Sequence, residues 1–366
     1  SCKGGICMRK HFLDNIRWIT VVLVVIYHVI YMYNGIASAG VIGPFYEKQY
    51  QDGIQYLLYP WFMLLLFIVS GICSRYYLDQ HRIKEFIRSR TRKLLVPSTV
   101  GLLVMGWIQG YFNMAISNAF ESMTDSVPGF AIYLIMVLSG IGVLWFIQML
   151  WVFSMLLAVI RRMEKGRLYK LAGRMNMAWL LLLVIPLYFS GRILNTPVIA
   201  VYRFGIYGFA FFLGYFVFAH DQIIERVGKY RFPLIFAAIV LGAVYLAMHY
   251  GDNYAVMPTV NCIPAVCYAW ISCLAIFGFM KKYGDKESAF TAFMTKHSFG
   301  LYVFHYLPLS ATAYALHKYT SVPALPSYLL TAFAAFLGSF VLYEIIVRIP
   351  LLRWCVLGIK KEKKNV

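Results

Sequence analysis

Ten apolar runs, most of them close to 20 residues long, dominate this sequence of 366 residues. A run of ~20 apolar residues is the length that an α-helix needs to cross the hydrocarbon core of a bilayer. Backbone amides find no water there, so each run is expected to be helical. We expect spans at 14–34, 56–78, 94–115, 141–160, 177–190, 204–219, 232–250, 262–280, 298–317 and 326–347. The pattern predicts an all-α, polytopic membrane helix bundle of about ten transmembrane helices.

The composition supports this class. Hydrophobic residues make up 61% of the chain and charged residues 13%, with a mean hydropathy of +0.68. A soluble domain would carry about 25% charged residues. We therefore expect a multi-pass protein of the cell membrane, more narrowly the bacterial plasma membrane, with membrane lipid as a partner.

The formal net charge of +19 raises the question of nucleic-acid binding. The basic residues, however, cluster in alternate loops, as they do in proteins oriented by cytoplasmic charge. These clusters lie in the ranges 3–10, 75–93, 161–174, 226–231, 281–296 and 353–364. We expect both termini in the cytoplasm and no nucleic-acid partner. The loop 191–203, which carries Arg192 and Arg203, fits the alternation least well.

The chain divides into three expected regions. Residues 1–13 form a cytoplasmic segment, 14–347 a transmembrane domain, and 348–366 a basic cytoplasmic tail. Met8 resembles a natural start, so residues 1–7 are interpreted as a remnant of cloning or annotation. Because the loops hold no separate soluble domain, any chemistry is expected within the bundle.

The first apolar run contains two ionisable residues, Arg17 and His28. Their spacing of eleven residues is nearly three helical turns, so both lie on one face, about 16–17 Å apart along the axis. Ionisable groups at membrane depth are costly and mark functional sites. Asp14 precedes Arg17 by almost one turn and is expected to orient its guanidinium.

The loop 79–97 is the most basic segment near this helix, with Arg88, Arg90, Arg92 and Lys93 ahead of Pro97. One interpretation is an anchor on anionic lipid. The other is a phosphate site, since guanidinium groups bind phosphate with two hydrogen bonds. The sequence alone leaves both interpretations open.

Arg17 and this loop together suggest a ligand with a phosphate head and a long thin arm. Acyl-CoA has that shape, with its head at the arginines and its thioester near His28. A neutral imidazole can take the proton of an attacking hydroxyl, or can itself accept the acyl group. We expect acyl-CoA as a donor substrate, no permanently bound cofactor and no metal.

Several segments resemble the acyltransferase 3 family of integral membrane O-acyltransferases. The first span is similar over Leu13 to Trp18 and Val24 to His28. Similar motifs follow in order at Phe67-Ile68-Val69-Ser70-Gly71, Arg88 to Pro97, Leu144-Trp145-Phe146, and Ser298 to His305 with its Ser-x-x-Leu-Tyr-x-x-His pattern. The resemblance covers nearly the whole chain.

The resemblance implies a ten-helix bundle that moves an acyl group, usually acetyl, from a cytoplasmic donor to an acceptor outside. It also implies that Arg17 and His28 are the residues most closely tied to activity. Trp18 departs from the family pattern, where glycine is common. The chain also lacks the fused esterase-like domain of some members, which leaves the acceptor open between an envelope polysaccharide and a glycolipid.

Further polar residues within the spans are candidates for the acceptor site. Tyr302 and His305 share a face, as do Trp145 and Gln148, while Glu344 is the acidic residue of the last span. Trp145 also suits an interfacial anchor, and Glu344 suits a structural ion pair.

Two other functions remain compatible with the residues alone. A transporter or flippase for an anionic or glycan substrate would use Arg17 and His28 as binding site and proton relay. A ligand-sensing membrane domain would need no catalysis. The resemblance, and the lack of paired repeats with broken helices, favour the enzyme.

Overall fold

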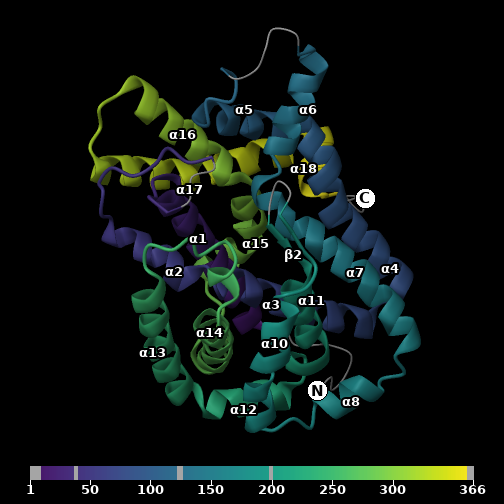
Figure 1. The fold of residues 1–366 in the computed structure, drawn as a ribbon. Helices are drawn as coiled ribbons and strands as arrows, with labels where there is room; N and C mark the ends of the chain where they lie inside the picture. The colour runs from purple at the N-terminus through teal and green to yellow at the C-terminus, as the bar shows by residue number, and fades with distance from the viewer. Residues whose placement is uncertain (1–9, 37–39, 122–126, 198–200, 361–366) are drawn as a thin grey trace.

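The computed structural model describes residues 10–36, 40–121, 127–197 and 201–360 (Figure 1). The first half contains α1 (His11–Met32), η1 (Tyr50–Asp52), α2 (Gly53–Leu58), α3 (Phe62–Gln80), α4 (Ile83–Arg90), η2 (Thr91–Leu95), η3 (Pro97–Gly106), α5 (Trp107–Ile116), α6 (Gly129–Ser139), η4 (Gly142–Leu144), α7 (Trp145–Met163), α8 (Arg167–Ala172), α9 (Met177–Leu182) and α10 (Val184–Ser190). The second half contains β1 (Asn195–Pro197), β2 (Val201–Arg203), α11 (Phe204–Leu213), η5 (Gly214–Phe218), α12 (Asp221–Lys229), α13 (Arg231–His249), η6 (Thr259–Asn261), α14 (Ile263–Tyr283), α15 (Ala289–Phe304), α16 (Tyr306–Tyr319), α17 (Ala324–Arg348) and α18 (Pro350–Leu357). The predicted all-α class is confirmed, apart from the antiparallel hairpin β1–β2.

Seven helical stretches in the described part of the chain are long and apolar enough to cross a membrane. An eighth results if Phe204–Phe218 and Asp221–Lys229, which meet at a bend of 96°, form one span. The expected span 177–190 is a shorter apolar helix, Met177–Ser190. The count of ten spans and the side on which the termini lie therefore stay predictions.

The expected span 298–317 is not one continuous helix. It divides at His305 into α15 and α16. Pro308 explains the break, because its ring nitrogen has no hydrogen to donate to the carbonyl of Phe304 one turn earlier. The break places His305 at a helix junction inside the bundle, where its side chain is fully buried.

Helix α1 lies inside the bundle rather than at its edge. It contacts α2, α3, α14, α15, α16 and α17. These neighbours come from both halves of the chain, and Figure 1 shows them arranged around α1. Side chains on α1 can therefore meet groups that are distant in the sequence.

Part of the expected tail belongs to the bundle. Helix α18 packs against η3, and Cys355, Val356 and Leu357 are buried there. A Cβ atom on Gly101 would lie 2.7 Å from the carbonyl oxygen of Cys355, so this contact depends on glycine. The segment after the last long helix thus packs against the helix that follows the basic loop.

Helix α3 crosses α11 and the adjoining η5 at two glycines. A Cβ atom on Gly71 would lie 1.9 Å from the carbonyl oxygen of Phe211, and one on Gly214 would lie 2.0 Å from that of Ile68. Small residues let membrane helices approach closely and gain backbone packing. Gly71 of the Phe-x-x-Ser-Gly motif is therefore a packing residue.

We predict that Gly71→Ala destabilises the protein by about 1–3 kcal/mol, because the added methyl group would force α3 and α11 apart. The control is Gly129→Ala, since a Cβ atom there meets nothing within 4 Å. Thermal unfolding of both variants in detergent measures the difference. Equal melting temperatures for the two variants would contradict the proposed crossing.

Candidate active site

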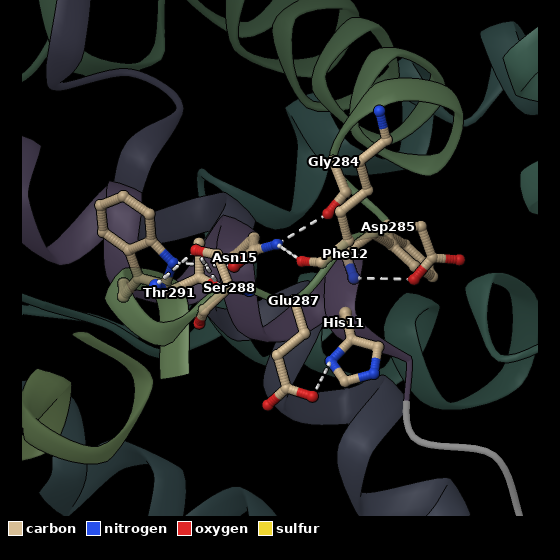
Figure 2. A network of polar contacts seen from close by, with 10 residues as sticks. His11, Phe12, Asn15, Gly284, Asp285, Glu287, Ser288 and Thr291 are labelled. Carbon is tan, nitrogen blue, oxygen red and sulfur yellow. Dashed lines mark hydrogen bonds and ion pairs between the residues drawn. The ribbon is translucent and has the colours of Figure 1, made fainter. Parts of the chain in front are cut away.

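The start of α1 is fixed by the loop between α14 and α15 (Figure 2). Asn15 is buried and donates from Nδ2 to the carbonyl oxygens of Gly284 at 2.7 Å and Lys286 at 2.9 Å. Its Oδ1 accepts from Trp18 Nε1 at 2.9 Å, and the backbone amide of Phe12 donates to Asp285 Oδ1 at 3.1 Å. These bonds set the rotation of α1, and thereby the direction of its functional face.

Arg17 lies on that face, with two neighbours that hold its guanidinium. Its Nη1 is 3.3 Å from Asp14 Oδ1, so the expected pairing is present, and its Nη2 is 3.1 Å from Cys73 Sγ on α3. Asp14 therefore acts on Arg17 rather than directly on the pocket described next. Cys73 was not predicted, although it lies one turn after Ser70 of the family-like motif.

Arg17 lines a pocket of about 400 Å³ together with two cations of the basic loop, Arg90 and Lys93. The Arg90 guanidinium donates from Nη2 to Ser74 Oγ at 3.1 Å. None of the described residues that line this pocket is acidic. The pocket therefore concentrates positive charge and suits an anion such as phosphate.

The residues that line the pocket range from exposed to buried. Lys93 and Ile359 lie where side chains are exposed or nearly so, whereas Val21, Phe146 and Tyr302 at the other end are buried. The walls between are mainly apolar, with Leu66, Leu94, Ile147, Leu150 and Phe299. This arrangement provides a charged mouth followed by an apolar channel that leads along α1.

His28 lies beyond the buried end and contacts His305. His28 Nδ1 is 2.8 Å from the carbonyl oxygen of Val24 and 3.1 Å from His305 Nε2. His305 Nδ1 lies 2.8 Å from the carbonyl oxygen of Tyr302 and 3.1 Å from that of Leu301. The sequence predicted His305 in the acceptor cavity, whereas the structure places it directly against His28.

These bonds assign the protons on both rings. A carbonyl oxygen can only accept, so each Nδ1 next to one carries the hydrogen. His305 Nε2 then has a free lone pair and accepts from His28 Nδ1. His28 Nε2 consequently keeps its own lone pair and is available to take a proton from a substrate.

The helical geometry of α1 separates this functional face from the lipid. His28 is rotated by about 20° from Arg17, whereas Ile26 is rotated by about 180°. Ile26 is exposed, while His28 and Tyr31 keep partial accessibility on the opposite side. The accessible surface of His28 therefore faces the bundle interior. Val24, only 1% exposed, lies on this face between the pocket and His28.

Not all predicted residues lie near the pocket or His28. Arg88 is exposed and Arg92 packs near Gly358, and neither lines the pocket. Gln148 bonds to the carbonyl oxygen of Ser98 at 3.2 Å and accepts from Tyr202 at 2.6 Å, which ties three segments together. The remaining two are Trp145, which packs on Tyr207 at 5.5 Å, and Glu344, which lies 3.5 Å from His297 and from Arg348.

Tyrosines surround His28, and the sequence analysis did not single them out. The rings of Tyr27 and Tyr306 have centroids 5.1 Å from the His28 ring, and that of Tyr31 is at 6.3 Å. Tyr31 follows His28 by three residues on the same helix, so helical spacing was the available signal. Tyr306 is adjacent to His305 in the chain.

We predict that Asn15→Ala lowers stability by about 1–3 kcal/mol, because it removes the donor for two backbone carbonyls. His11→Ala is the control in the same network, since its contact with Glu287 is 3.7 Å long and partly exposed. Thermal unfolding compares the two variants. A loss for His11→Ala as large as that for Asn15→Ala would contradict the role given to Asn15.

Comparison with known proteins gives one match. The family model described as an acyltransferase domain, acyltransferase 3, matches residues 10–344. No curated protein and no solved structure matches the sequence significantly. The family match and the apolar helices support a membrane enzyme and give no support to a transporter. The chain belongs to the acyltransferase 3 family and is a membrane acyltransferase that transfers groups other than amino-acyl groups.

Proposed function

We propose that this enzyme moves an acyl group, most simply acetyl, from cytoplasmic acyl-CoA to a hydroxyl group of an envelope polysaccharide or glycolipid. One observation carries the proposal. A single face of α1 presents Arg17 to a basic pocket and His28 to a second imidazole. A donor site and a proton acceptor are thereby aligned along one helix.

The basic pocket is the proposed donor site. The CoA phosphates bind at its mouth to Lys93 and Arg90, and Arg17 binds the ligand farther in, with Asp14 holding its guanidinium. The apolar walls then suit the uncharged arm that carries the thioester. For Arg90 and Lys93, the pocket therefore favours the phosphate-site interpretation over the lipid anchor. Arg88 and Arg92 lie outside the pocket.

His28 is the proposed general base. As the acceptor oxygen forms its bond to the thioester carbon, His28 Nε2 takes the hydroxyl proton. The carbon–sulfur bond then breaks, and the departing thiolate receives that proton from His28. The products are the acyl ester and CoA with a free thiol, and the imidazole returns to its starting state.

His305 is the proposed positioning residue for this base. Its fixed Nε2 lone pair holds the His28 Nδ1 hydrogen and directs Nε2 toward the substrate. It also stabilises the positive charge that His28 gains during proton transfer. In a Ser-His-Asp triad an aspartate orients the catalytic imidazole. In this proposal a second histidine, His305, has that role.

We predict that His28→Gln lowers kcat for acetyl transfer at least about a hundredfold, the lower limit for loss of a general base. Radiolabelled acetyl-CoA and purified protein in detergent measure both donor consumption and acceptor acylation. Transfer by His28→Gln at the wild-type rate would overturn the mechanism.

We predict that His305→Gln lowers kcat by about tenfold or more while the KM for acetyl-CoA stays unchanged, because only base orientation is lost. His297→Gln is the matched control. His297 lies on α15 and is buried as His305 is, and its Nδ1 likewise contacts a carbonyl oxygen of α15, that of Phe293 at 2.8 Å. Equal losses of kcat in both variants would reduce His305 to a structural residue.

We predict that Arg90→Gln weakens CoA binding by about tenfold, because a guanidinium–phosphate bond is charge-assisted. Arg88→Gln is the control, since Arg88 belongs to the same loop but lies outside the pocket. Titration at two salt concentrations measures the dissociation constants and should show a smaller salt dependence for Arg90→Gln. If Arg88→Gln weakens binding equally, CoA binds the loop surface and not the pocket.

A further inference from the structure

A third arginine, Arg203, is buried at the start of α11, and no acidic side chain of the described residues forms an ion pair with it. Only 6% of it is exposed. Its Nη2 donates to the amide oxygen Oδ1 of Asn261 at 3.1 Å. Removing a charge from water is costly when no opposite charge compensates it.

The neighbours of Arg203 fix its guanidinium but do not neutralise it. Asn261 is itself held, since its Nδ2 donates to the carbonyl oxygen of Tyr188 at 3.1 Å. A Cβ atom on Gly191 would fall 1.8 Å from Asn261 Oδ1, so the amide is also confined from the other side. A neutral, preorganised partner leaves the full positive charge available to a ligand.

Arg203 and His28 lie at similar depth in the bundle. Lys10 pairs with Asp221, which places the start of α1 beside the bend that follows η5. His28 is 18 residues beyond Lys10, or roughly 27 Å along the helix, and Arg203 is 15 residues before Phe218, or roughly 22 Å. The buried guanidinium therefore lies at the level of the proposed reaction, far from the donor cations.

Aromatic side chains lie beside both residues. The guanidinium carbon of Arg203 is 5.8 Å from the ring centroid of Tyr207. The Tyr59 ring lies 5.9 Å from that of Tyr27, which is 5.1 Å from His28. Tyrosine rings and hydroxyls are suited to sugar rings, because they combine an apolar face with a polar tip.

Part of this aromatic wall is accessible. His28 and Tyr31 on α1, Tyr306 on α16, and Tyr59 directly after α2 all keep intermediate exposure. On α1, His28 and Tyr31 point away from the lipid-exposed Ile26, as their angular positions require. A ligand could thus contact His28 and the tyrosines together, with Arg203 at the edge of the same wall.

We propose that Arg203 binds an anionic group of the acceptor, a carboxylate or a phosphate, so that the acceptor is an acidic glycan or glycolipid. The proposal rests on the acyl-transfer function proposed above. The guanidinium receives the acidic group, the tyrosines contact the sugar, and the hydroxyl to be acylated is presented to His28. The acidic group supplies the counter-charge that Arg203 lacks.

The test measures binding of three matched probes to the full chain in lipid nanodiscs. These are methyl glucoside, which is neutral, methyl glucuronide, which carries a carboxylate, and methyl glucoside 6-phosphate. We expect at least one acidic probe to bind about tenfold more tightly than the neutral one, as a charge-assisted pair requires. The acidic probe that binds more tightly identifies carboxylate or phosphate as the preferred group.

Two variants remove or neutralise the positive charge of Arg203. Arg203→Gln deletes the guanidinium, and Asn261→Asp places a carboxylate against it with little change of shape. Both should bring the affinity ratio of acidic to neutral probe to within about twofold. Arg192→Gln is the control from the same loop, because Arg192 is exposed and bonds to Tyr188, and it should keep the wild-type ratio.

The proposal is overturned if the wild type shows no preference for either acid, or if both charge variants keep it. Loss of the preference in Arg192→Gln would also overturn it, since the loop surface would then bind the acid. Acetyl transfer by His28→Gln is measured in parallel. Undiminished transfer there refutes the catalytic mechanism while leaving the binding result for Arg203 independent.

Discussion

The contact between His28 and His305 is the interaction on which the rest of the site depends. A polar ring inside an apolar bundle is tolerated only when its hydrogen-bonding atoms have partners. The Val24 carbonyl and His305 Nε2 share the Nδ1 hydrogen of His28, and the Tyr302 carbonyl accepts that of His305. A single lone pair, on His28 Nε2, is then left for chemistry. The break between α15 and α16 at His305 is what brings the second ring there.

Helix α1 carries both halves of the proposed reaction, so its rotation matters as much as its sequence. Asn15 fixes that rotation at one end, and the imidazole pair fixes it near the other. Between them, the buried side chain of Val24 lies on the same face. In the proposed reaction this apolar side chain helps to exclude water from the thioester.

The sequence predicted the parts of the site that a single helix encodes. Arg17 and His28 share a face through a spacing of eleven residues, and Asp14 reaches Arg17 within one turn. It could not separate Arg90 from Arg88, because the packing of α4 against α3 and α7 decides which side chain enters the pocket. His305 was found as a polar residue, but its contact with His28 joins residues 277 positions apart, and helical periodicity carries no such information.

Loop 191–203 departs from the alternation of basic loops, and the structure gives a physical explanation. A topology signal requires basic side chains in water or at lipid headgroups, and Arg192 meets that condition because it is exposed. Arg203 does not, because it is buried beside Asn261 and Tyr207. Burial without a counter-charge is unfavourable for folding, so a residue kept there needs a compensating ligand or function. In the proposed reaction, the enzyme thus uses guanidinium groups at two depths, Arg17 and Arg90 for the donor, and Arg203 for an acidic acceptor at the level of His28.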